Sequence, residues 1–174
     1  MRLSRISAES ADATIRRLGA EDAEQYHLLN LEALERHPEA FAADLEEESA
    51  RSLEEVRERL ERQTIYGAFD GGLLIATVTF HRLADRKRSH VGMLWGLYVT
   101  PAYRKHGIAR RLIEHAVGEA ARLVDQVELY VEEHNRGAIE LYRQLGFEQY
   151  GLMRRSLRVA GRDHNAVMMV RILR

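Results

Sequence analysis

A short basic turn between two apolar segments restricts the fold of this chain more than any other feature of its sequence. The turn spans residues 104–109 and contains a single glycine, Gly107. Residues 93–99 before it are apolar and typical of a strand, and residues 110–117 after it place apolar side chains at helical spacing. The first amides of a helix have no partners within the helix and carry the positive end of its dipole, so phosphate groups bind there. The sequence therefore predicts a strand, a turn and a helix start that together bind a pyrophosphate.

Small and basic residues in and beside the turn support this interpretation. Gly107 and Ala109 lack bulk, so the backbone can approach a ligand closely. Positive charge comes from four residues, which are Arg104, Lys105, Arg110 and Arg111. The alternative interpretation is a solvated basic helix start with no ligand.

Two common phosphate-binding motifs do not fit the turn, because the P-loop ends in Gly-Lys-Ser/Thr and the dinucleotide fingerprint needs a second glycine two residues after the first. The turn matches instead the Arg/Gln-x-x-Gly-x-Gly/Ala signature of the GNAT superfamily of acyl-CoA-dependent N-acyltransferases. The resemblance extends to two flanking motifs, Leu97-Tyr98-Val99-x-Pro101-x-Tyr103 and Asn135-x-x-Ala138-Ile139-x-Leu141-Tyr142-x-x-x-Gly146-Phe147. The chain therefore resembles GNAT proteins over about residues 13–173.

The pattern along the chain predicts a mixed α/β fold. We expect strands at residues 13–18, 65–69, 73–81, 90–99, 127–131, 147–159 and 164–172, with a tight hairpin turn at residues 70–72. Helices are expected at 21–36, from Leu53 onward with Ser52 as cap, at 107–123 and at 135–145 with Asn135 as cap. Residues 41–52 are predicted to be a polar, acidic connection. The order βααβββαβαββ is the GNAT order, and the resemblance implies a splayed V between the strands at 90–99 and 127–131.

Length and composition indicate one domain at residues 13–174, preceded by a loose leader at residues 1–12. The chain has no cysteine, which excludes disulfides, cysteine-ligated metals and a covalent thioester intermediate on the enzyme. We expect no metal site. No apolar run approaches the ~20 residues of a membrane span, and the N-terminus lacks the apolar centre of a signal peptide. The expected location is the cytoplasm, with no membrane partner.

Charge is distributed unevenly along the chain. Residues 21–61 contain fourteen acids and four bases, whereas residues 82–111 contain eight bases and one acid. The basic block coincides with the predicted pyrophosphate site, so a polyanionic cofactor is a sufficient partner for it. A nucleic-acid partner is not expected, because a broad basic face with stacking aromatics is missing. The acidic block either borders a groove for cationic substrates or forms a solvated helical face.

The resemblance implies that acetyl-CoA, as co-substrate, lies in the V with its pantetheine arm paired to exposed backbone. The expected cofactor-binding residues are Leu97, Tyr98, Val99, Arg104, Lys105, His106, Gly107, Ile108, Ala109, Arg110, Asn135 and Tyr142. The backbone N–H of Leu97 would donate to the thioester carbonyl oxygen, as an oxyanion donor does. Asn135 would contact the cofactor arm as well as capping its helix.

Two residues are expected to be catalytic, Leu97 through its N–H and Tyr142 as general acid to the departing thiolate. The alternative for Tyr142 is a packed aromatic side chain. No general base is assigned, because positions 91–95 hold no carboxylate; His81, His90 and His106 are nearby, and a water relay to a more distant carboxylate is another route. Trp95 should share a face with Leu97, as the floor of an acceptor pocket or as sheet core.

The resemblance predicts an acetyl-CoA-dependent N-acetyltransferase that transfers its acetyl group directly to a primary amine. A small-molecule amine is the expected acceptor, and a protein N-terminus or lysine is the alternative within this class. The alternative from a different class is a non-catalytic acyl-CoA-binding module. The chain is expected to be a monomer or a homodimer, and the sequence does not identify the acceptor.

Overall fold

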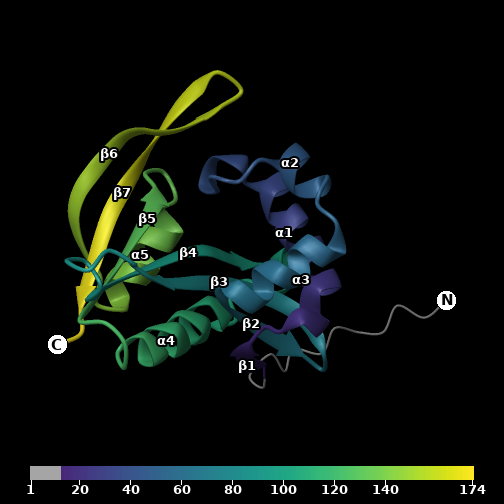
Figure 1. The fold of residues 1–174 in the computed structure, drawn as a ribbon. Coiled ribbons are helices and arrows are strands. Elements are labelled where there is room, and N and C mark those ends of the chain that lie inside the picture. The colour runs from purple at the N-terminus through teal and green to yellow at the C-terminus, as the bar shows by residue number, and fades with distance from the viewer. Residues whose placement is uncertain (1–12) are drawn as a thin grey trace.

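The computed structural model describes residues 13–174, so the expected leader lies outside the described residues. A seven-stranded sheet in the order β1-β2-β3-β4-β5-β7-β6 runs through the molecule (Figure 1). Its strands are β1 (Thr14–Arg17), β2 (Thr64–Asp70), β3 (Leu73–Arg82), β4 (Val91–Val99), β5 (Gln126–Glu132), β6 (Glu148–Val159) and β7 (Arg162–Ile172). The helices are α1 (Ala23–Arg36), α2 (Leu45–Ser49), α3 (Leu53–Arg62), α4 (Ile108–Ala120) and α5 (Arg136–Gln144). Short 3-10 turns are η2 (Ala20–Asp22), η3 (Pro38–Ala40) and η4 (Pro101–Tyr103).

The sheet is mixed, and its one parallel pair is short. Strands β1 to β4 form an antiparallel meander, β5 lies parallel to β4, and β7 and β6 continue antiparallel. Pairing between β4 and β5 runs only from Val91 with Gln126 to Leu94 with Leu129. Beyond this point β4 pairs only with β3, and β5 pairs only with β7. The predicted splayed V is therefore confirmed.

Two clusters of buried side chains hold helices on opposite faces of the sheet. Residues of α4 and α5 pack with β2 to β5 and β7 in the larger cluster, whose members include Leu112, Ile113 and Leu129. Residues of α1 and α3 pack with Ile65, Phe69 and Leu74 in the second cluster. Figure 1 shows α4 on one side of the sheet, α1 to α3 on the other, and the β6–β7 hairpin rising beside α1 and α2.

Local sequence explains most element boundaries, which differ from the predicted ones by at most a few residues. Ser52 caps α3 in a capping box with Glu55, and Asn135 caps α5 by accepting a hydrogen bond from the Ala138 N–H at 3.2 Å. Gly71 and Gly72 adopt positive φ angles of 53° and 95° in the turn between β2 and β3.

The predicted connection at residues 41–52 is wrong in one respect, because it contains the short helix α2. Asp44 caps this helix by accepting hydrogen bonds from the Glu46 and Glu47 amides at 2.9 and 3.1 Å. Its buried Glu48 binds Arg51 of the following turn and Arg59 of α3. This anchoring by ion pairs replaces the apolar stripe from which a helix is normally recognised.

Candidate active site

A β-bulge in β4 lies where the V opens. Thr79 of β3 pairs with Trp95, and Thr77 pairs with Tyr98, so two β4 residues lie opposite a single β3 residue. One of these two residues is Gly96, whose φ of 67° is the left-handed conformation that glycine adopts readily. The bulge changes the direction of the backbone of Gly96 and Leu97 at the point where β5 leaves β4.

The bulge also overturns the expected orientation of Trp95. Residues directly opposite each other on paired strands point to the same face, so Trp95 and Tyr98 share the face of Thr77 and Thr79. Leu97 points to the other face and packs against the cluster that includes α4. Trp95 is 44% exposed and contacts the His81 ring, with 5.8 Å between ring centroids, so it is not sheet core. We call the face of β4 and β5 opposite α4 the cleft face; Met93, Trp95, Glu128 and Tyr130 lie on it.

The predicted pyrophosphate turn leads into an uncapped helix start. Gly107 is the N-cap residue of α4, with a φ of 77° and no side-chain hydrogen bond to the first amides. A Cβ added at Gly107 would meet no atom within 4 Å, so the backbone here is open to an approaching group. Lys105 also has a positive φ, of 65°, and residues 104–107 are all exposed. Unpaired amides at an open helix start fit a phosphate group.

The basic side chains around the turn do not all gather at one point, as the sequence suggested. Arg104 folds back toward β4, where its Nε donates to the Val99 carbonyl at 2.9 Å and its guanidinium lies 3.1 Å from His37 Nε2. Arg110 binds the Gln144 side chain of α5. Arg111 donates to the Ala13 carbonyl at 2.8 Å. Three of the four basic side chains are therefore held by other groups of the protein, whereas the backbone at Gly107 is open.

Tyr142 on α5 has a buried ring and a hydroxyl without a hydrogen-bond partner in the described part of the chain. The side chain is 8% exposed, and its ring contacts Phe147 edge-on at 5.7 Å between centroids. The hydroxyl has no hydrogen-bond partner among residues 13–174. In these residues every fully buried side-chain oxygen or nitrogen has a partner, so the Tyr142 oxygen is not fully buried. Burial raises the pKa of the Tyr142 hydroxyl, which keeps it protonated at neutral pH. Such a phenol is able to donate a hydrogen bond to a ligand.

Comparisons with known proteins agree with this geometry. The model of the acetyltransferase (GNAT) family matches residues 24–147. This chain belongs to the GNAT family. It is 38% identical over 97 residues to the N-alpha-acetyltransferase RimI of Mycobacterium tuberculosis, covering 56% of this chain and 60% of RimI. It is 32% identical over 147 residues to the mycothiol acetyltransferase of Beutenbergia cavernae, covering 79% of this chain and 48% of that protein. The chain thus spans about half the length of such curated relatives.

Solved GNAT structures share the fold. The structure of yncA from Salmonella typhimurium, determined with acetyl-CoA, has a TM-score of 0.82 at 19% identity and covers 94% of this chain and 95% of that one. None of the helices in residues 13–174 combines the length and apolar character needed to cross a membrane. The same residues contain no group of three or more histidine, aspartate or glutamate side chains placed to hold a metal ion.

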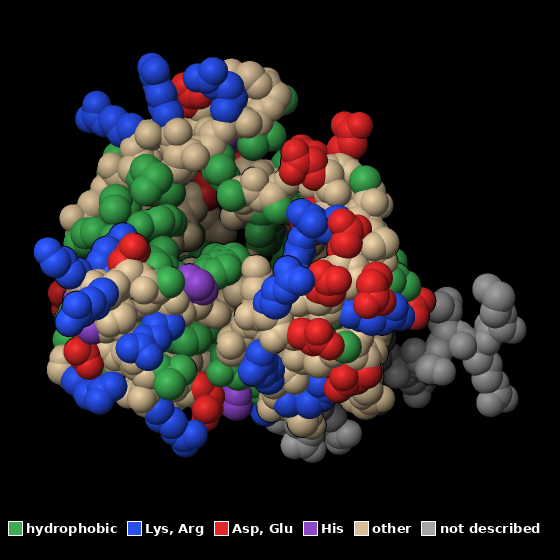
Figure 2. All heavy atoms as spheres, in the orientation of Figure 1, with side chains coloured by type: hydrophobic (Ala, Val, Ile, Leu, Met, Phe, Trp, Pro, Cys, Tyr) green, Lys and Arg blue, Asp and Glu red, His purple; other side chains and the backbone are tan. Residues whose placement is uncertain are grey.

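A cavity of about 390 Å³ lies beside the mouth of the V in this GNAT fold. It is lined by side chains of η3, β5, β7 and the start of α5, namely His37, Glu39, Glu132, His134, Asn135 and His164. Asn135 therefore caps α5, as expected, and also lines this cavity. Figure 2 shows the hollow between the β6–β7 hairpin and the helical side of the molecule.

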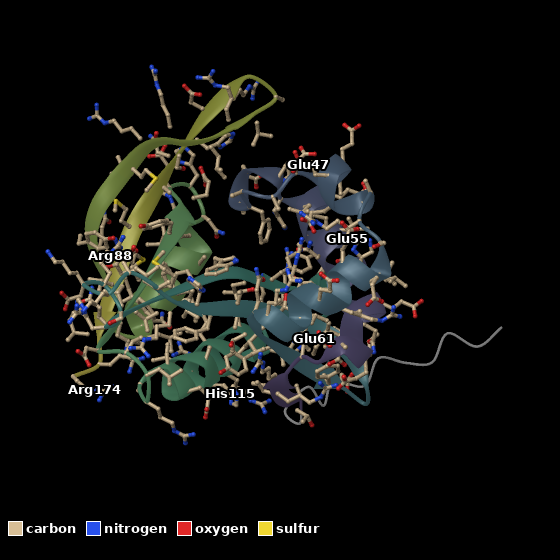
Figure 3. The ribbon with its side chains drawn as sticks, viewed as in Figure 1. Glu47, Glu55, Glu61, Arg88, His115 and Arg174 are labelled. Atoms are coloured by element: carbon tan, nitrogen blue, oxygen red, sulfur yellow. The ribbon has the colours of Figure 1, made fainter. Side chains whose placement is uncertain are left out.

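Most of the acidic block faces away from this cavity. Glu47, Glu55 and Glu61, labelled in Figure 3, are exposed on α2 and α3. Glu39 reaches the cavity, and Glu32 of α1 accepts hydrogen bonds from Tyr98 at 2.7 Å and Thr100 at 3.0 Å. Burial and the bond to Glu32 raise the pKa of Tyr98 to about 12. The block is thus largely a solvated helical face, with Glu32 and Glu39 directed toward the cavity side and Asp22 and Glu48 buried in ion pairs.

Sequence reasoning missed the carboxylates of β5. In this strand Val127, Leu129 and Val131 are buried, so the alternating polar side chains of Glu128, Tyr130 and Glu132 point to the cleft face. The period-two pattern was visible in the sequence. The three histidines considered as bases are separated: His81 contacts Trp95, His90 is in the loop before β4, and His106 is in the pyrophosphate turn.

Proposed function

We propose that this chain transfers an acetyl group from acetyl-CoA directly to a primary amine. One observation carries the proposal: the V between β4 and β5 opens beside the uncapped start of α4. An extended acyl-CoA arm needs exposed strand backbone, and its pyrophosphate needs unpaired amides. The fold supplies both within one short stretch of chain, from Leu97 to Arg110.

Particular residues would hold acetyl-CoA, which supplies an activated acetyl group. Amides of residues 104–110 would bind the pyrophosphate, and the exposed backbone from Leu97 to Val99 would pair with the pantetheine arm. The Val99 carbonyl already accepts from Arg104, so the arm uses the Val99 N–H or displaces this guanidinium. Asn135 would contact the arm from the opposite side of the V.

Two groups of the chain would act on the reacting atoms. The Leu97 N–H, redirected by the bulge at Gly96, would stabilise negative charge on the carbonyl oxygen. The Tyr142 hydroxyl would donate to the departing thiolate. Since the chain has no cysteine, the acetyl group cannot pass through a cysteine thioester, and direct attack by the amine is the simplest route.

The proposed acceptor is a small-molecule primary amine, and a protein amine is the second candidate. The small-molecule acceptor is supported by similarity to mycothiol acetyltransferase, which extends over most of this chain. The protein acceptor is supported by similarity to RimI, an N-alpha-acetyltransferase. Both candidates are primary amines that enter from the cleft face.

Turnover of acetyl-CoA with an amine panel tests the proposal. The panel contains polyamines, aminoglycosides, amino acids and short peptides with unblocked N-termini, and thiol release is measured with and without each amine. We expect amine-dependent thiol release together with an acetylated product identified by mass spectrometry. Tight acetyl-CoA binding with no acetylated product from any class would instead support a non-catalytic acyl-CoA-binding module.

A further inference from the structure

The mechanism above lacks a group that takes the proton of the attacking amine, and one carboxylate lies where such a group is needed. Glu128 pairs with Met93, one residue before the parallel pairing of β4 and β5 ends at Leu94 and Leu129. Paired residues point to one face, so the Glu128 side chain is directed to the cleft face at the base of the V. The side chain is 13% exposed, which leaves it accessible but largely shielded from water.

Exposed aromatic side chains share the face of this carboxylate. Trp95, Tyr130 and Tyr150 are each more than two-fifths exposed, although large aromatic residues are usually buried. Trp95 is two residues after Met93 on β4, and Tyr130 is two residues after Glu128 on β5, so both lie on the cleft face where the strands part. A carboxylate beside exposed aromatic rings is suited to binding a protonated amine, through charge and through cation–π attraction.

Hydrogen bonds orient Glu128 and connect it to Tyr150 of β6. Gln126 Nε2 donates to Oε1 at 3.0 Å, and the Tyr150 hydroxyl donates to Oε2 at 3.3 Å. Burial, and then the proximity of Glu128 and Tyr130, raise the pKa of Tyr150. Tyr150 therefore stays protonated at neutral pH, with a hydroxyl oxygen that can still accept a hydrogen bond. This hydroxyl contacts the Glu128 carboxylate and also interacts with the Tyr130 side chain.

We propose that Glu128, acting through the Tyr150 hydroxyl, binds the acceptor ammonium group and receives its proton. The ammonium N–H passes its proton to the Tyr150 oxygen while the Tyr150 O–H passes its own to Glu128 Oε2. The ammonium group becomes a neutral amine with a lone pair for attack, the carboxylate becomes a carboxylic acid, and Tyr150 is neutral before and after. The inference rests on the proposed function, and it adds the base that sequence reasoning left open.

Charged and titratable groups from several elements face Glu128. Arg88 of the β3–β4 loop, labelled in Figure 3, has a guanidinium nitrogen 4.0 Å from Glu128 Oε2. Glu148 of β6 lies in the same row of the sheet, because both glutamates pair with Val170. Tyr130 and Tyr150 flank the carboxylate, and His81 faces Met93 across β3 and β4.

The test compares Glu128→Gln and Tyr150→Phe with Glu148→Gln as matched control. Glu148→Gln removes the same charge from the same row of the same face, but Glu148 is exposed and has no phenol partner. Measurements are kcat/KM for the best amine of the panel from pH 6 to pH 10, acetyl-CoA affinity by calorimetry, and amine affinity by calorimetry in the presence of CoA. A weakly basic primary amine of similar size, which is neutral at pH 7, serves as the rescue substrate.

Glu128→Gln and Tyr150→Phe should each lower kcat/KM at pH 7 by about 10²-fold or more, the lower end expected of a general base. The loss should shrink to a few-fold at pH 10, and also with the weakly basic amine at pH 7, because both arrive deprotonated. Amine affinity should fall in Glu128→Gln. Acetyl-CoA affinity should stay unchanged in all three variants, and Glu148→Gln should keep the pH profile of the unmodified protein.

Three results would overturn the inference. One is a Glu128→Gln variant with the pH profile of the unmodified protein. Another is an equal loss in Glu148→Gln, which would indicate a general effect of charge on this face. The third is a loss that does not depend on pH or on amine basicity, which would assign Glu128 a structural role. Failure of the proposed function is distinct, because the unmodified protein would then acetylate no amine.

Discussion

Replacing Tyr142 with phenylalanine separates its chemical role from its packing role. The ring is 8% exposed and rests edge-on against Phe147, whereas the hydroxyl has no hydrogen-bond partner among residues 13–174. Phenylalanine keeps the ring, so stability should change by less than about 0.5 kcal/mol, whereas truncation to alanine would cost about 3–5 kcal/mol. A change in rate in the phenylalanine variant therefore reports on the hydroxyl alone.

The size of the rate effect follows from the chemistry of the leaving thiol. General acids contribute about 10²–10⁴-fold, and a thiol of pKa ~8.5 leaves tolerably without help, so the lower end is expected. Burial raises the pKa of Tyr142, which keeps the hydroxyl protonated but makes it a weaker acid, and this also favours the lower end. We expect kcat to fall about 10²-fold, equivalent to about 2.7 kcal/mol in the activation barrier.

The assay is single-turnover acetyl transfer, in which product release does not limit the rate. Tyr66→Phe is the control, because Tyr66 is also buried in the larger core cluster but contacts His115 away from the V. It should keep the unmodified rate, and both variants should bind acetyl-CoA within a few-fold of the unmodified affinity. Because the folded pKa of Tyr142 is raised, its protonated form persists up to at least pH ~10, so it should add no alkaline limb below that pH. A Tyr142→Phe variant with the unmodified single-turnover rate would refute the acid role and leave packing as the function of this residue.

Three further predictions concern the cofactor site, the acceptor and stability. Gly107→Glu should abolish calorimetric acetyl-CoA binding in a folded protein, since it adds a side chain and a negative charge where the backbone meets phosphate; unchanged affinity would place the pyrophosphate elsewhere. Cationic amines should be acetylated faster than anionic amino acids of similar size, because Glu128 and Glu132 point to the cleft face, and equal turnover would contradict this. Glu48→Gln should cost about 3 kcal/mol in the free energy of unfolding by leaving the partly buried Arg59 unpaired. Burial alone would raise the pKa of Glu48, but the hydrogen bonds and charges of Arg59 and Arg51 together outweigh burial and lower the pKa below its ordinary 4.5. This stability is therefore present above pH 4.5 and lost as pH falls through the lowered pKa. Urea denaturation at pH 7 and pH 3 should show a smaller pH difference for the variant, and an equal difference would contradict the ion-pair account.

Features set by local chemistry were predictable from the sequence. The hairpin between β2 and β3 follows from Gly71 and Gly72, which take up the positive φ angles of the turn. The start of α3 follows from Ser52, the predicted cap, which the structure shows in a capping box with Glu55. The V was predicted through resemblance to GNAT proteins and not through periodicity, since no residue of β4 or β5 by itself indicates where pairing ends.

Features that depend on distant contacts were not predicted. Helix α2 is held by Glu48, whose partner Arg59 comes eleven residues later on another helix. The opposite orientation of Trp95 and Leu97 depends on pairing of β4 with β3, which places a bulge at Gly96. A glycine inside a strand often marks a bulge, so Gly96 could have indicated one. The prediction that Trp95 and Leu97 share a face assumes instead that side chains alternate regularly along the whole strand.

The carboxylate of Glu128 shows why the face of a residue and its role are separate questions. Alternation in β5 is enough to predict that Glu128, Tyr130 and Glu132 share one face, because the intervening residues are apolar. Elements far away in the sequence decide whether that face meets solvent, core or cleft. Helix α1 and η3 come before β2 in the chain, and β6, which lies beyond β7 in the sheet, contributes Tyr150. A chemical role for the polar side chains of β5 is indicated only by two tertiary features: β4 and β5 separate beside them, and β6 places the Tyr150 hydroxyl against the Glu128 carboxylate. The fold thus places a carboxylate on β5, next to the β4 positions 91–95 that hold none.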